Sequence, residues 1–517
     1  MRAIGIWRAL ESARRRVLAD AGLPPPRPAP SGIGRRAVLR ALAAAPALAA
    51  MPAPAAIRPG QRVAIIGGGI AGLAALHHLR RAGVDAQVYE ARRRLGGRMH
   101  TLKRGGRPVF ERGGQLVNTD HADIRALCGA LGIGLVDREA ERAETQVIAD
   151  GAVLSQAQLA AGLAPIAERI DADSALLDSD YDRYAPRFDR LSIANYLDRH
   201  AALLPAPWVR RLLESTARTE YGAEPDHASA LELIFNLPTV DGERVEVLGA
   251  SDERFLIDGG SGALIDALAA AHPGRIAQGK EVIRIERAGA RLRLIFLDLT
   301  SVEADRVIVA VPASIARRIE YAVPIAADWR AFLDVMELGR NEKRQTLTIA
   351  RPWTATLGAG GELWPTDPGT PALAWDGGVV TGGDRAPVWT VFLGGDQVTA
   401  RPDLDRLLAA CAPAVPGIRE AYAGPIGLND RDFTAWHTDP LTLGAYSNFP
   451  PGQLTRFAHL FWLEDAVNAR AAASRILFAS EHLSDAFPGY MNGAAQTGRL
   501  AAAALLGRQL APESIAA

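Results

Sequence analysis

Residues 62–72 read Arg-Val-Ala-Ile-Ile-Gly-Gly-Gly-Ile-Ala-Gly, a short apolar run that ends in closely spaced glycines. Continuous apolar runs of this length are typical of buried parallel strands. Gly67, Gly69 and Gly72 have the spacing G-x-G-x-x-G. A helical pattern follows over residues 70–82. The stretch therefore predicts a strand, a tight turn and a helix.

The three glycines have separate physical roles in a dinucleotide-binding turn. The first permits the tight turn, the second lets the backbone approach a pyrophosphate, and the third lets the helix pack closely on the strand. Free N–H groups and the helix dipole then favour phosphate at the N-terminus of the helix. A second strand over residues 86–89 ends at Glu90, about 20 residues further on, where a carboxylate accepts hydrogen bonds from ribose hydroxyls. The pattern predicts a dinucleotide with an unphosphorylated ribose; the alternative is a Gly-rich turn in an ordinary α/β domain.

The continuation of the chain indicates which dinucleotide is bound. Residues 90–99 read Glu-Ala-Arg-Arg-Arg-Leu-Gly-Gly-Arg-Met, which resembles a segment of the flavin-containing amine oxidase family. That resemblance implies an α/β fold in which a Rossmann-like FAD-binding domain of the glutathione-reductase type is interleaved with an α+β substrate-binding domain. It also implies that four residues lie along the pyrophosphate and ribityl chain of FAD: Arg94, Gly96, Gly97 and Arg98. The alternative for three consecutive arginines is a solvated run of charge.

The composition excludes several other classes of protein. The chain has 517 residues, of which 48% are hydrophobic and 22% are charged, as expected of a soluble globular protein with more than one domain. Its 58 basic residues balance 58 acidic ones, which gives no reason to expect nucleic-acid binding or a strongly basic membrane-binding surface. The two cysteines, Cys128 and Cys411, lie far apart, so we expect no metal cluster and no redox pair.

Residues 1–56 have the features of an export signal rather than of the fold. They contain an arginine-rich region with the pair Arg35-Arg36, a short apolar segment, and small residues near Ala53 and Ala55. The paired arginines predict the twin-arginine export machinery as a partner and a periplasmic or secreted protein. The apolar segment, roughly fourteen residues, is too short to span a bilayer, so no stable membrane insertion is expected. A disordered extension or a misplaced start codon is the alternative.

Further segments extend the resemblance. Glu111-Arg-Gly113-Gly114 is similar to the family segment whose backbone passes close to the flavin ring. Several L-amino-acid oxidases have an arginine two residues further on that clamps the substrate carboxylate, whereas Leu116 stands there in this chain. An amine without an α-carboxylate is therefore favoured, although another arginine could supply the charge. Residues 120–250 are predicted to be mainly helical and contain no chemical motif; His121, Tyr181 and Tyr184 are interpreted as surface or packing residues.

The second half of the chain supplies the adenine contact and a lysine. The resemblance implies that Val282, in a strand over residues 281–285, contacts the adenine end of FAD through backbone atoms. Residues 305–312 are predicted to form a parallel strand that ends at proline. Lys343 follows Leu338-Gly339 by four residues, as in the family, where the lysine holds a water against flavin N5. A solvated strand residue is the alternative for Lys343.

Two C-terminal segments resemble the family's closing motifs. Residues 436–447 and 476–494 imply an aromatic cage of Tyr446 and Tyr490, whose electron-rich faces would orient an amine. Tyr490, Met491 and Glu481 are also expected at the cofactor, with Glu481 beside the ribityl chain. Ala445 stands where monoamine oxidases carry the flavin-attaching cysteine, so we expect noncovalent FAD. Ordinary core aromatics are the alternative for the two tyrosines.

Together these segments predict the domains and the reaction. The FAD-binding domain is assigned to residues 57–120, 251–315 and 437–510, and the substrate-binding domain to residues 121–250 and 316–436. FAD-dependent oxidation of a small-molecule amine would give an imine and then a carbonyl with ammonia or a smaller amine, with electrons passed to O2 or a periplasmic carrier. The alternatives are an L-amino-acid oxidase, a flavin desaturase, and a non-catalytic exported flavoprotein.

Overall fold

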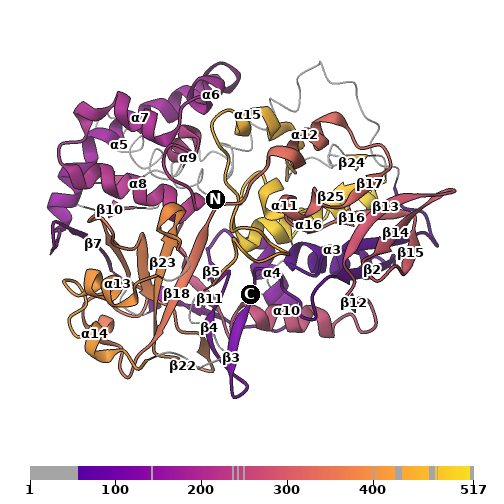
Figure 1. Ribbon diagram of the computed structural model, residues 1–517, viewed down its shortest axis with the longest axis horizontal. Helices are drawn as coiled ribbons and strands as arrows, with labels where there is room; N and C mark the ends of the chain where they lie inside the picture. Colours follow the sequence, from indigo (N-terminus) through magenta and orange to yellow (C-terminus); the bar gives the residue numbers. More distant parts are fainter. Residues whose placement is uncertain are drawn as a thin grey trace, which may run out of the picture.

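The architecture rests on two large sheets that lie in separate halves of the molecule (Figure 1). The computed structural model describes residues 56–140, 144–235, 238–241, 244–247, 251–399, 402–424, 434–464, 472–473 and 475–512. Residues 1–55, which carry the predicted export signal, lie outside this range. Among the described residues, no helix combines the length and the apolar character needed to cross a bilayer.

The first sheet contains β1, the strand that directly precedes the glycine fingerprint. Its order is β12-β2-β1-β16-β25-β24, and every neighbouring pair is parallel except β24 with β25. The strands are β1 (Arg62–Ile66), β2 (Asp85–Glu90), β12 (Ile276–Gln278), β16 (Arg306–Val309), β24 (Ala472–Ala473) and β25 (Ile476–Phe478). Strands buried on both faces need continuous apolar runs, which is why residues 63–66 and 307–309 are entirely buried. The predicted fold class, a Rossmann-like domain joined to a second domain, is confirmed.

Two helices cover this sheet and meet each other. α3 (Ile70–Arg81) follows β1, and α16 (Met491–Leu506) returns from the far end of the chain to pack along it. α3 ends one residue earlier than predicted. α16 begins at Met491, three residues before the predicted start, because Tyr490 already has the extended backbone of an N-cap residue.

Smaller sheets flank the first one. β13 (Val282–Ala288) pairs with β14 (Arg291–Phe296) and β17 (Glu320–Ala322), and β15 (Ser301–Ala304) pairs with β14. A three-stranded sheet contains β5 (Leu116–Val117), β11 (Phe255–Ile257) and β6 (Leu135–Asp137). β3 (Thr101–Arg104) and β4 (Arg107–Glu111) form a hairpin. Helices α4 (Ala122–Ala130), α10 (Ser261–Ala270), α11 (Ala313–Ala316), α12 (Ala327–Val335) and α15 (Gln453–Phe457) complete this half.

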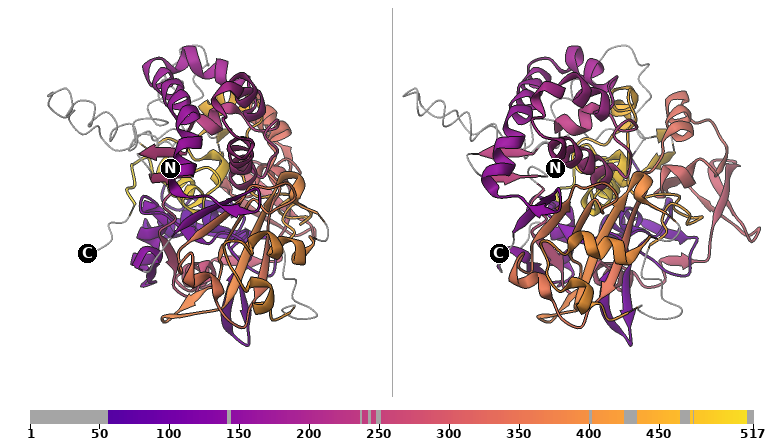
Figure 2. Two further views of the ribbon diagram at one scale, coloured as in Figure 1. Left: turned by 90° about the vertical axis from the view of Figure 1, so that its left-hand side faces the viewer. Right: turned by 60° about the vertical axis from the view of Figure 1, so that its left-hand side comes forward.

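The second sheet lies in the other half of the molecule. Its order is β18-β23-β20-β19-β7-β8, with bounds β18 (Asn341–Leu347), β23 (Val388–Gly394), β20 (Leu373–Asp376), β19 (Glu362–Pro365), β7 (Thr145–Ala149) and β8 (Ala152–Val153). Figures 1 and 2 show a helical layer on one side of it. That layer comprises α5 (Gln156–Ser179), α6 (Tyr181–Asp189), α7 (Ile193–Arg199), α8 (Pro207–Tyr221) and α9 (Ala230–Phe235). α13 (Leu404–Cys411) and α14 (Ile418–Ala421) pack on this sheet in a second hydrophobic core shared with β19, β20 and β23.

The region 120–250 is helical as expected over α5–α9, but the prediction missed its strands. β6 pairs with β11 in the three-stranded sheet, and β7 and β8 belong to the second large sheet. β9 (Thr239–Asp241) pairs with β10 (Arg244–Glu246). β6 and β7 are fixed by pairing with β11 and β19, which are distant in the sequence, rather than by a local pattern. The predicted domain boundaries stay predictions. Two contacts in the structure cross them: α4 and β17, assigned to the substrate-binding domain, contact α16 and β13, which are assigned to the FAD-binding domain.

Close packing of α16 on α3 depends on a glycine, and this gives a first prediction. A Cβ added at Gly498 would lie 2.2 Å from the Ala71 carbonyl oxygen, an atom of the α3 backbone that cannot rotate away. We therefore expect Gly498→Ala to lower the free energy of unfolding by about 1–3 kcal/mol and to weaken cofactor retention, since α3 begins at the fingerprint. Thermal unfolding and the ratio of flavin to protein measure the two effects.

The matched control is Gly134→Ala. A Cβ there would meet only Asp258 atoms at 3.5 Å or more, in ordinary van der Waals contact. Its effect on stability should stay within about 0.5 kcal/mol. Equal stability of the two variants would contradict the proposed packing role of Gly498.

Candidate active site

A long cavity runs between the two halves of the molecule. One end is lined by the fingerprint turn and the end of β2, and the other by α8, β18, β20 and β23. The lining residues from the first end include Gly67, Gly69, Glu90, Gly96, Gly97, Arg98, Val282, Glu481 and Met491. Those from the second end include Thr219, Glu220, Asn341, Lys343, Leu373, Trp375, Phe392, Tyr446 and Tyr490. The cavity therefore brings together all but two of the predicted site residues; Gly72 and Arg94 do not line it.

Two of the fingerprint glycines, Gly67 and Gly72, are tightly packed, whereas Gly69 has open space where a side chain would lie. Gly67 has φ +107°, and a Cβ there would lie 2.7 Å from the Ala310 carbonyl oxygen. A Cβ on Gly72 would lie 2.0 Å from the Gly67 carbonyl oxygen, so this residue lets α3 pack on the turn. A Cβ on Gly69 would meet no atom within 4 Å. Gly69 thus leaves the free N–H groups at the start of α3 open to a ligand's pyrophosphate.

Glu90 ends β2 with its carboxylate held in place. The residue is buried, and its two oxygens accept the backbone N–H groups of Gly68 at 2.6 Å and Arg92 at 2.8 Å. A carboxylate has further lone pairs beyond these two bonds. It can therefore also accept hydrogen bonds from the hydroxyls of a ribose that lies in the cavity.

In the loop after β2, Arg92 lines the cavity and the predicted Arg94 does not. Arg94 donates to the carbonyl oxygens of Gly97 at 2.8 Å and Leu95 at 3.2 Å, so in this structure it braces the loop from outside the cavity. Arg92 lines the cavity instead and forms an ion pair with Asp439. Sequence reasoning did not single out Arg92, because the three consecutive arginines look alike.

Arg98, which is partly exposed, forms an ion pair with the buried Glu481 where both line the cavity. Arg98 Nη1 lies 2.9 Å from Glu481 Oε1, and the other oxygen of Glu481 accepts the N–H of Gly489 at 2.7 Å. Burial acts to raise the pKa of the Glu481 carboxyl, but the Arg98 charge and this N–H outweigh it, so the pKa lies below its usual value. Glu481 is therefore ionised beside the predicted ribityl position.

Backbone atoms approach the cavity closely at Gly113 and Gly114. A Cβ on Gly113 would lie 1.6 Å from the Arg98 carbonyl oxygen, and one on Gly114 would lie 2.6 Å from Met491 Cγ. Both glycines follow β4 and line the cavity with Met491. Any side chain in this segment would push the backbone out of the position that the resemblance assigns next to the flavin ring.

Lys343 is buried in β18 and reaches across to the other half. Its Nζ donates to the Gly113 carbonyl oxygen at 2.7 Å and lies 3.3 Å from Gln115 Oε1, with the Trp375 ring centroid 5.3 Å away. Burial lowers the pKa of Lys343 to about 8, against the opposing charges of Glu111 and Glu253. With an exposed fraction of 8%, Lys343 is not the solvated strand residue of the alternative interpretation.

The two tyrosines predicted to form a cage lie near each other at the far end of the cavity. The Tyr446 hydroxyl donates to the Thr219 carbonyl oxygen, and a Cβ on Gly489, next to Tyr490, would lie 2.9 Å from the Tyr446 ring. The Tyr490 hydroxyl lies 3.4 Å from Glu220 Oε2 and 3.4 Å from Ser251 Oγ. Both rings line the cavity, as a cage requires.

His121 is a packing residue and lies behind the cage. It is fully buried, and its ring meets the Tyr490 ring edge-on at 5.2 Å between centroids. Burial lowers the pKa of His121 well below its usual value, so the ring is neutral. Tyr181 is also buried, whereas Tyr184 is partly exposed, and neither lines the cavity.

Several lining residues at the substrate end escaped the sequence analysis. They come from several distant segments and belong to no motif: Gln115, Glu220, Glu253, Leu373, Trp375 and Phe392. Burial and the neighbouring Glu362 raise the pKa of the Glu253 carboxyl well above its usual value. Leu116 also lines the cavity, so the position where an arginine would clamp a carboxylate is apolar.

The described residues fit FAD and do not fit a metal. Gly69 leaves open the N-terminus of α3, Glu90 offers acceptors, and Arg98 brings positive charge to the middle of the cavity. Within the described ranges no group of three or more His, Cys, Asp or Glu residues could hold a metal ion. Cys128 and Cys411 are buried, their thiol pKa values are raised by burial to about 12, and neither lines the cavity.

Comparison with known proteins defines the class to which this site belongs. Residues 70–506 match the family described as flavin containing amine oxidoreductase. The chain belongs to that family and is a FAD-dependent oxidoreductase of the amine oxidase type.

Individual relatives agree on the family and differ in the substrate that they name. Amine oxidase [flavin-containing] B of Sus scrofa is 23% identical over 462 residues, covering 86% of each chain. The L-amino acid dehydrogenase of Synechocystis is 24% identical over 473 residues, covering 86% of this chain and 94% of its own. The structure of cyclohexylamine oxidase from Brevibacterium oxydans superposes with a TM-score of 0.71 at 23% identity, over 87% of this chain and 99% of its own. At this identity the structural likeness shows the fold alone.

The absence of a cysteine among the lining residues leads to a second prediction. Ala445 lines the cavity beside Tyr446, and both cysteines of the chain lie elsewhere. Acid denaturation should therefore release all of the yellow colour into the supernatant, where its spectrum is read against the protein pellet. Colour that stays with the precipitated protein would show a covalent bond and contradict noncovalent FAD.

Proposed function

We propose that the protein oxidises an amine that has no carboxylate on the reacting carbon. The observation that carries this proposal is the set of groups around Lys343: a buried lysine held on the Gly113 carbonyl oxygen, with Tyr446 and Tyr490 lining the same cavity. FAD held by the start of α3, Glu90 and Arg98 would supply an acceptor for the hydride equivalent from the C–H bond beside nitrogen. The product imine then hydrolyses to a carbonyl compound and ammonia or a smaller amine.

The residues of the chain orient the amine and control protons. Electron-rich faces of the Tyr446 and Tyr490 rings attract the nitrogen and fix the direction of the reacting carbon. The hydrogen bond from Tyr446 to the Thr219 carbonyl oxygen keeps its ring from turning. Lys343, whose pKa of about 8 lies near neutrality, can hold or release a proton through a water at its Nζ.

The charges at the substrate end favour an amine over an α-amino acid. The described arginines that line the cavity are Arg92, Arg98, Arg112 and Arg318, and none of them lies on α8, β18, β20 or β23. Those four elements contribute one cation, Lys343, and one acid, Glu220, and the segment before β11 adds Glu253. Among the described residues at this end, a substrate carboxylate would lack an arginine as a bidentate partner. This arrangement weighs against the L-amino-acid oxidase alternative.

A flavin desaturase and a non-catalytic flavoprotein each account for less of the site. A desaturase acting on C–C bonds has no need of two tyrosines and a buried lysine at the end of the cavity. A non-catalytic flavoprotein would not require a cavity that also reaches α8, β20 and β23. The electron acceptor is proposed to be O2 or a small carrier.

We also propose that the protein is exported through the twin-arginine route and works in the periplasm or outside the cell. The support is the arginine pair and apolar segment within residues 1–56. A protein that binds FAD in the cytoplasm must cross the membrane folded, which this route permits. Cell fractionation of the wild type and an Arg35→Lys, Arg36→Lys double variant tests the proposal; equal export of both would refute it.

An anaerobic titration of the oxidised holoenzyme tests the proposed reaction. Benzylamine, cyclohexylamine, putrescine, spermidine, L-leucine and L-lysine are added separately, and bleaching of the flavin band is recorded in a stopped-flow spectrometer. We expect at least one amine to reduce the flavin faster than either amino acid. Faster reduction by the amino acids would favour the L-amino-acid oxidase, and no reduction by any compound would remove the amine oxidation proposal.

Lys343→Met tests the lysine separately from cofactor binding. Loss of the buried ammonium should slow flavin reduction or reoxidation by about 10²-fold while the flavin content is unchanged. The pH profile of the affected step should show an inflection near pH 8 in the wild type that is lost in the variant, because the Lys343 pKa lies there. Lys103→Met, which removes an exposed lysine of the β3–β4 hairpin, is the control. Wild-type rates in both half-reactions would exclude Lys343 from the mechanism.

A further inference from the structure

Gln115 lies next to Lys343, where the two halves of the molecule meet. It follows Gly113 and Gly114 in the segment between β4 and β5, has an exposed fraction of 5%, and lines the cavity. Its Oε1 is 3.3 Å from Lys343 Nζ. Glutamine is mostly found at protein surfaces, and a buried polar group needs hydrogen-bond partners. The contacts of this amide group therefore indicate what the residue does.

Lys343 belongs to a row of side chains on one face of the second sheet. Along the paired strands β18, β23 and β20, Lys343 lies opposite Phe392, and Phe392 lies opposite Leu373. Side chains of paired residues share a face of the sheet, as do residues two apart on one strand, so Trp375 shares this face. All four residues line the cavity. This face of the sheet meets Gln115 through Lys343 and Trp375.

The partners of Gln115 fix the direction of its amide group. Nε2 donates to the Gly377 carbonyl oxygen at 3.2 Å, whereas Oε1 accepts from Trp375 Nε1 and from Lys343 Nζ, both at 3.3 Å. A carbonyl oxygen can only accept, and an indole N–H and an ammonium group can only donate. The opposite orientation would lose all three bonds, so the oxygen of the amide faces Lys343.

The Gly377 carbonyl group is itself held in place. Gly377 directly follows β20, and its N–H donates to the Val388 carbonyl oxygen of β23 at 2.9 Å. A Cβ on Gly377 would collide with Thr390 Oγ1, so the backbone lies tight against β23. The amide group of Gln115 is therefore bound to the same sheet that carries Lys343, and this fixes the position of its oxygen relative to Nζ.

The ammonium group of Lys343 has two fixed acceptors. Nζ donates to the Gly113 carbonyl oxygen at 2.7 Å and to Gln115 Oε1, and the Trp375 ring lies beside it. An ammonium group has three N–H donors, so one remains beyond these two bonds for a group bound in the cavity. A neutral amine has two N–H groups and a lone pair, and with both acceptors in place it would present the lone pair there instead. The two acceptors thus fix the direction in which titration of Lys343 changes the group it presents.

We propose that Gln115 is a positioning residue for Lys343, whose ammonium group it holds through its amide oxygen so that the remaining N–H faces the cavity. This inference rests on the proposed function, in which Lys343 holds or releases a proton. An acceptor bonded to a charged donor stabilises the charged form. Gln115 therefore keeps Lys343 protonated up to a higher pH than burial alone would allow. The other charged groups that act on Lys343 in the same sense are Glu111 of β4 and Glu253 of the segment before β11.

The composition of the chain allows the protonation of Lys343 to be measured directly. The sequence has three lysines, Lys103, Lys280 and Lys343. Lys103 pairs with Asp266 and Lys280 with Asp298, and both lysine side chains are partly exposed. Holoenzyme labelled with lysine that carries ¹³C at Cε should give three NMR signals, and the signal missing from Lys343→Met belongs to Lys343. Its chemical shift against pH gives the midpoint of protonation without substrate and without turnover.

Two substitutions of Gln115 should move this midpoint in opposite directions. The wild-type midpoint should lie near pH 8, because burial lowers the pKa of Lys343 to about 8. Gln115→Met provides a side chain of similar length without an amide oxygen, and the midpoint should fall by about one pH unit. Gln115→Glu should raise it, because a carboxylate accepts more strongly from an ammonium group than an amide does. An unchanged midpoint in either variant would overturn the proposal.

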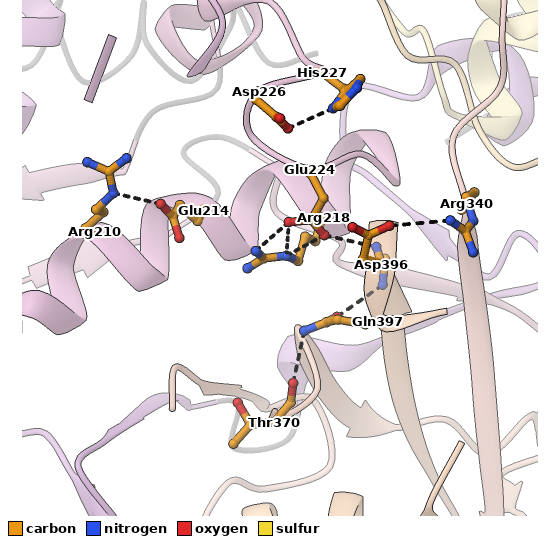
Figure 3. A network of polar contacts seen from close by, with 11 residues as sticks. Arg210, Glu214, Arg218, Glu224, Asp226, His227, Arg340, Thr370, Asp396 and Gln397 are labelled. Carbon is orange, nitrogen blue, oxygen red and sulfur yellow. Dashed lines mark hydrogen bonds and ion pairs between the residues drawn. The ribbon is translucent and has the colours of Figure 1, made fainter. Parts of the chain in front are cut away.

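Gln397→Met is the matched control. Figure 3 shows the contact of Gln397 with Thr370, whose carbonyl oxygen accepts from Nε2 at 2.9 Å, and Oε1 accepts the Gly394 N–H at 3.2 Å. Both ends of this amide group are bonded, as in Gln115, but Gln397 does not line the cavity. Gln397→Met should leave the midpoint of Lys343 unchanged. An equal fall in Gln397→Met and Gln115→Met would assign the effect to general loosening and overturn the proposal.

Thermal unfolding and flavin content show whether each variant is folded. A merely structural role of Gln115 would lower both in Gln115→Met and leave the midpoint where it is. If Gln115→Met does not fold, Gln115→Glu, which has nearly the same shape as the wild type, decides alone. A midpoint in Gln115→Glu that is equal to or below the wild-type value would then overturn the proposal.

The pH profile of flavin reduction provides a second measurement with the amine that reacts fastest. Its inflection should move to lower pH in Gln115→Met by the same amount as the NMR midpoint. The two proposals fail in different ways. If no amine of the panel reduces the flavin, amine oxidation is refuted, and the NMR midpoint still decides the role of Gln115. If amines are oxidised and the midpoint does not move, only the role of Gln115 is overturned.

Discussion

The hydrogen bond from Lys343 to Gly113 is the contact on which the site depends. Burying an ammonium group costs several kcal/mol unless it is hydrogen-bonded, and the acceptors of Lys343 come from the other half of the molecule. The strand β18 can therefore occupy its place only when the loop after β4 is also in place. A single buried cation thus couples the second sheet to the segment that the resemblance sets beside the flavin.

The lining changes in character along the cavity, and this separates its two ends. At one end the start of α3 and Arg98 offer hydrogen-bond donors and positive charge, which suits a pyrophosphate. At the other end several lining side chains are apolar or aromatic, among them Leu373, Trp375 and Phe392, and burial raises the pKa of the Glu253 carboxyl well above its usual value. Charges interact more strongly away from water, so the Arg98 charge acts strongly on an anion bound between the halves.

The sequence was sufficient where the structure is local. The unit β1-α3-β2 could be predicted because its apolar run, glycine spacing and helical pattern are all features of the local sequence between Arg62 and Glu90. Lys343, Tyr446 and Tyr490 could be found because they sit in motifs that resemble a family. Arg94 shows the limit of that method: its neighbour Arg92 lines the cavity, and only the three-dimensional path of the loop distinguishes the two.

The residues that escaped prediction share a physical cause. Gln115, Glu220, Trp375 and Phe392 each lie on a different element, and each enters the cavity because of how that element packs on its neighbours. Along α8 the sequence shows only a helix that ends at Gly222, and a glutamate near a helix end looks like an ordinary exposed residue. It is buried because Asn341 and Arg340 bind the last carbonyl groups of the helix and turn this residue inward. The far end of the cavity therefore depends on tertiary contacts of α8 and the second sheet, whereas the fingerprint turn and Glu90 at the cofactor end lie in one stretch that the sequence alone reveals.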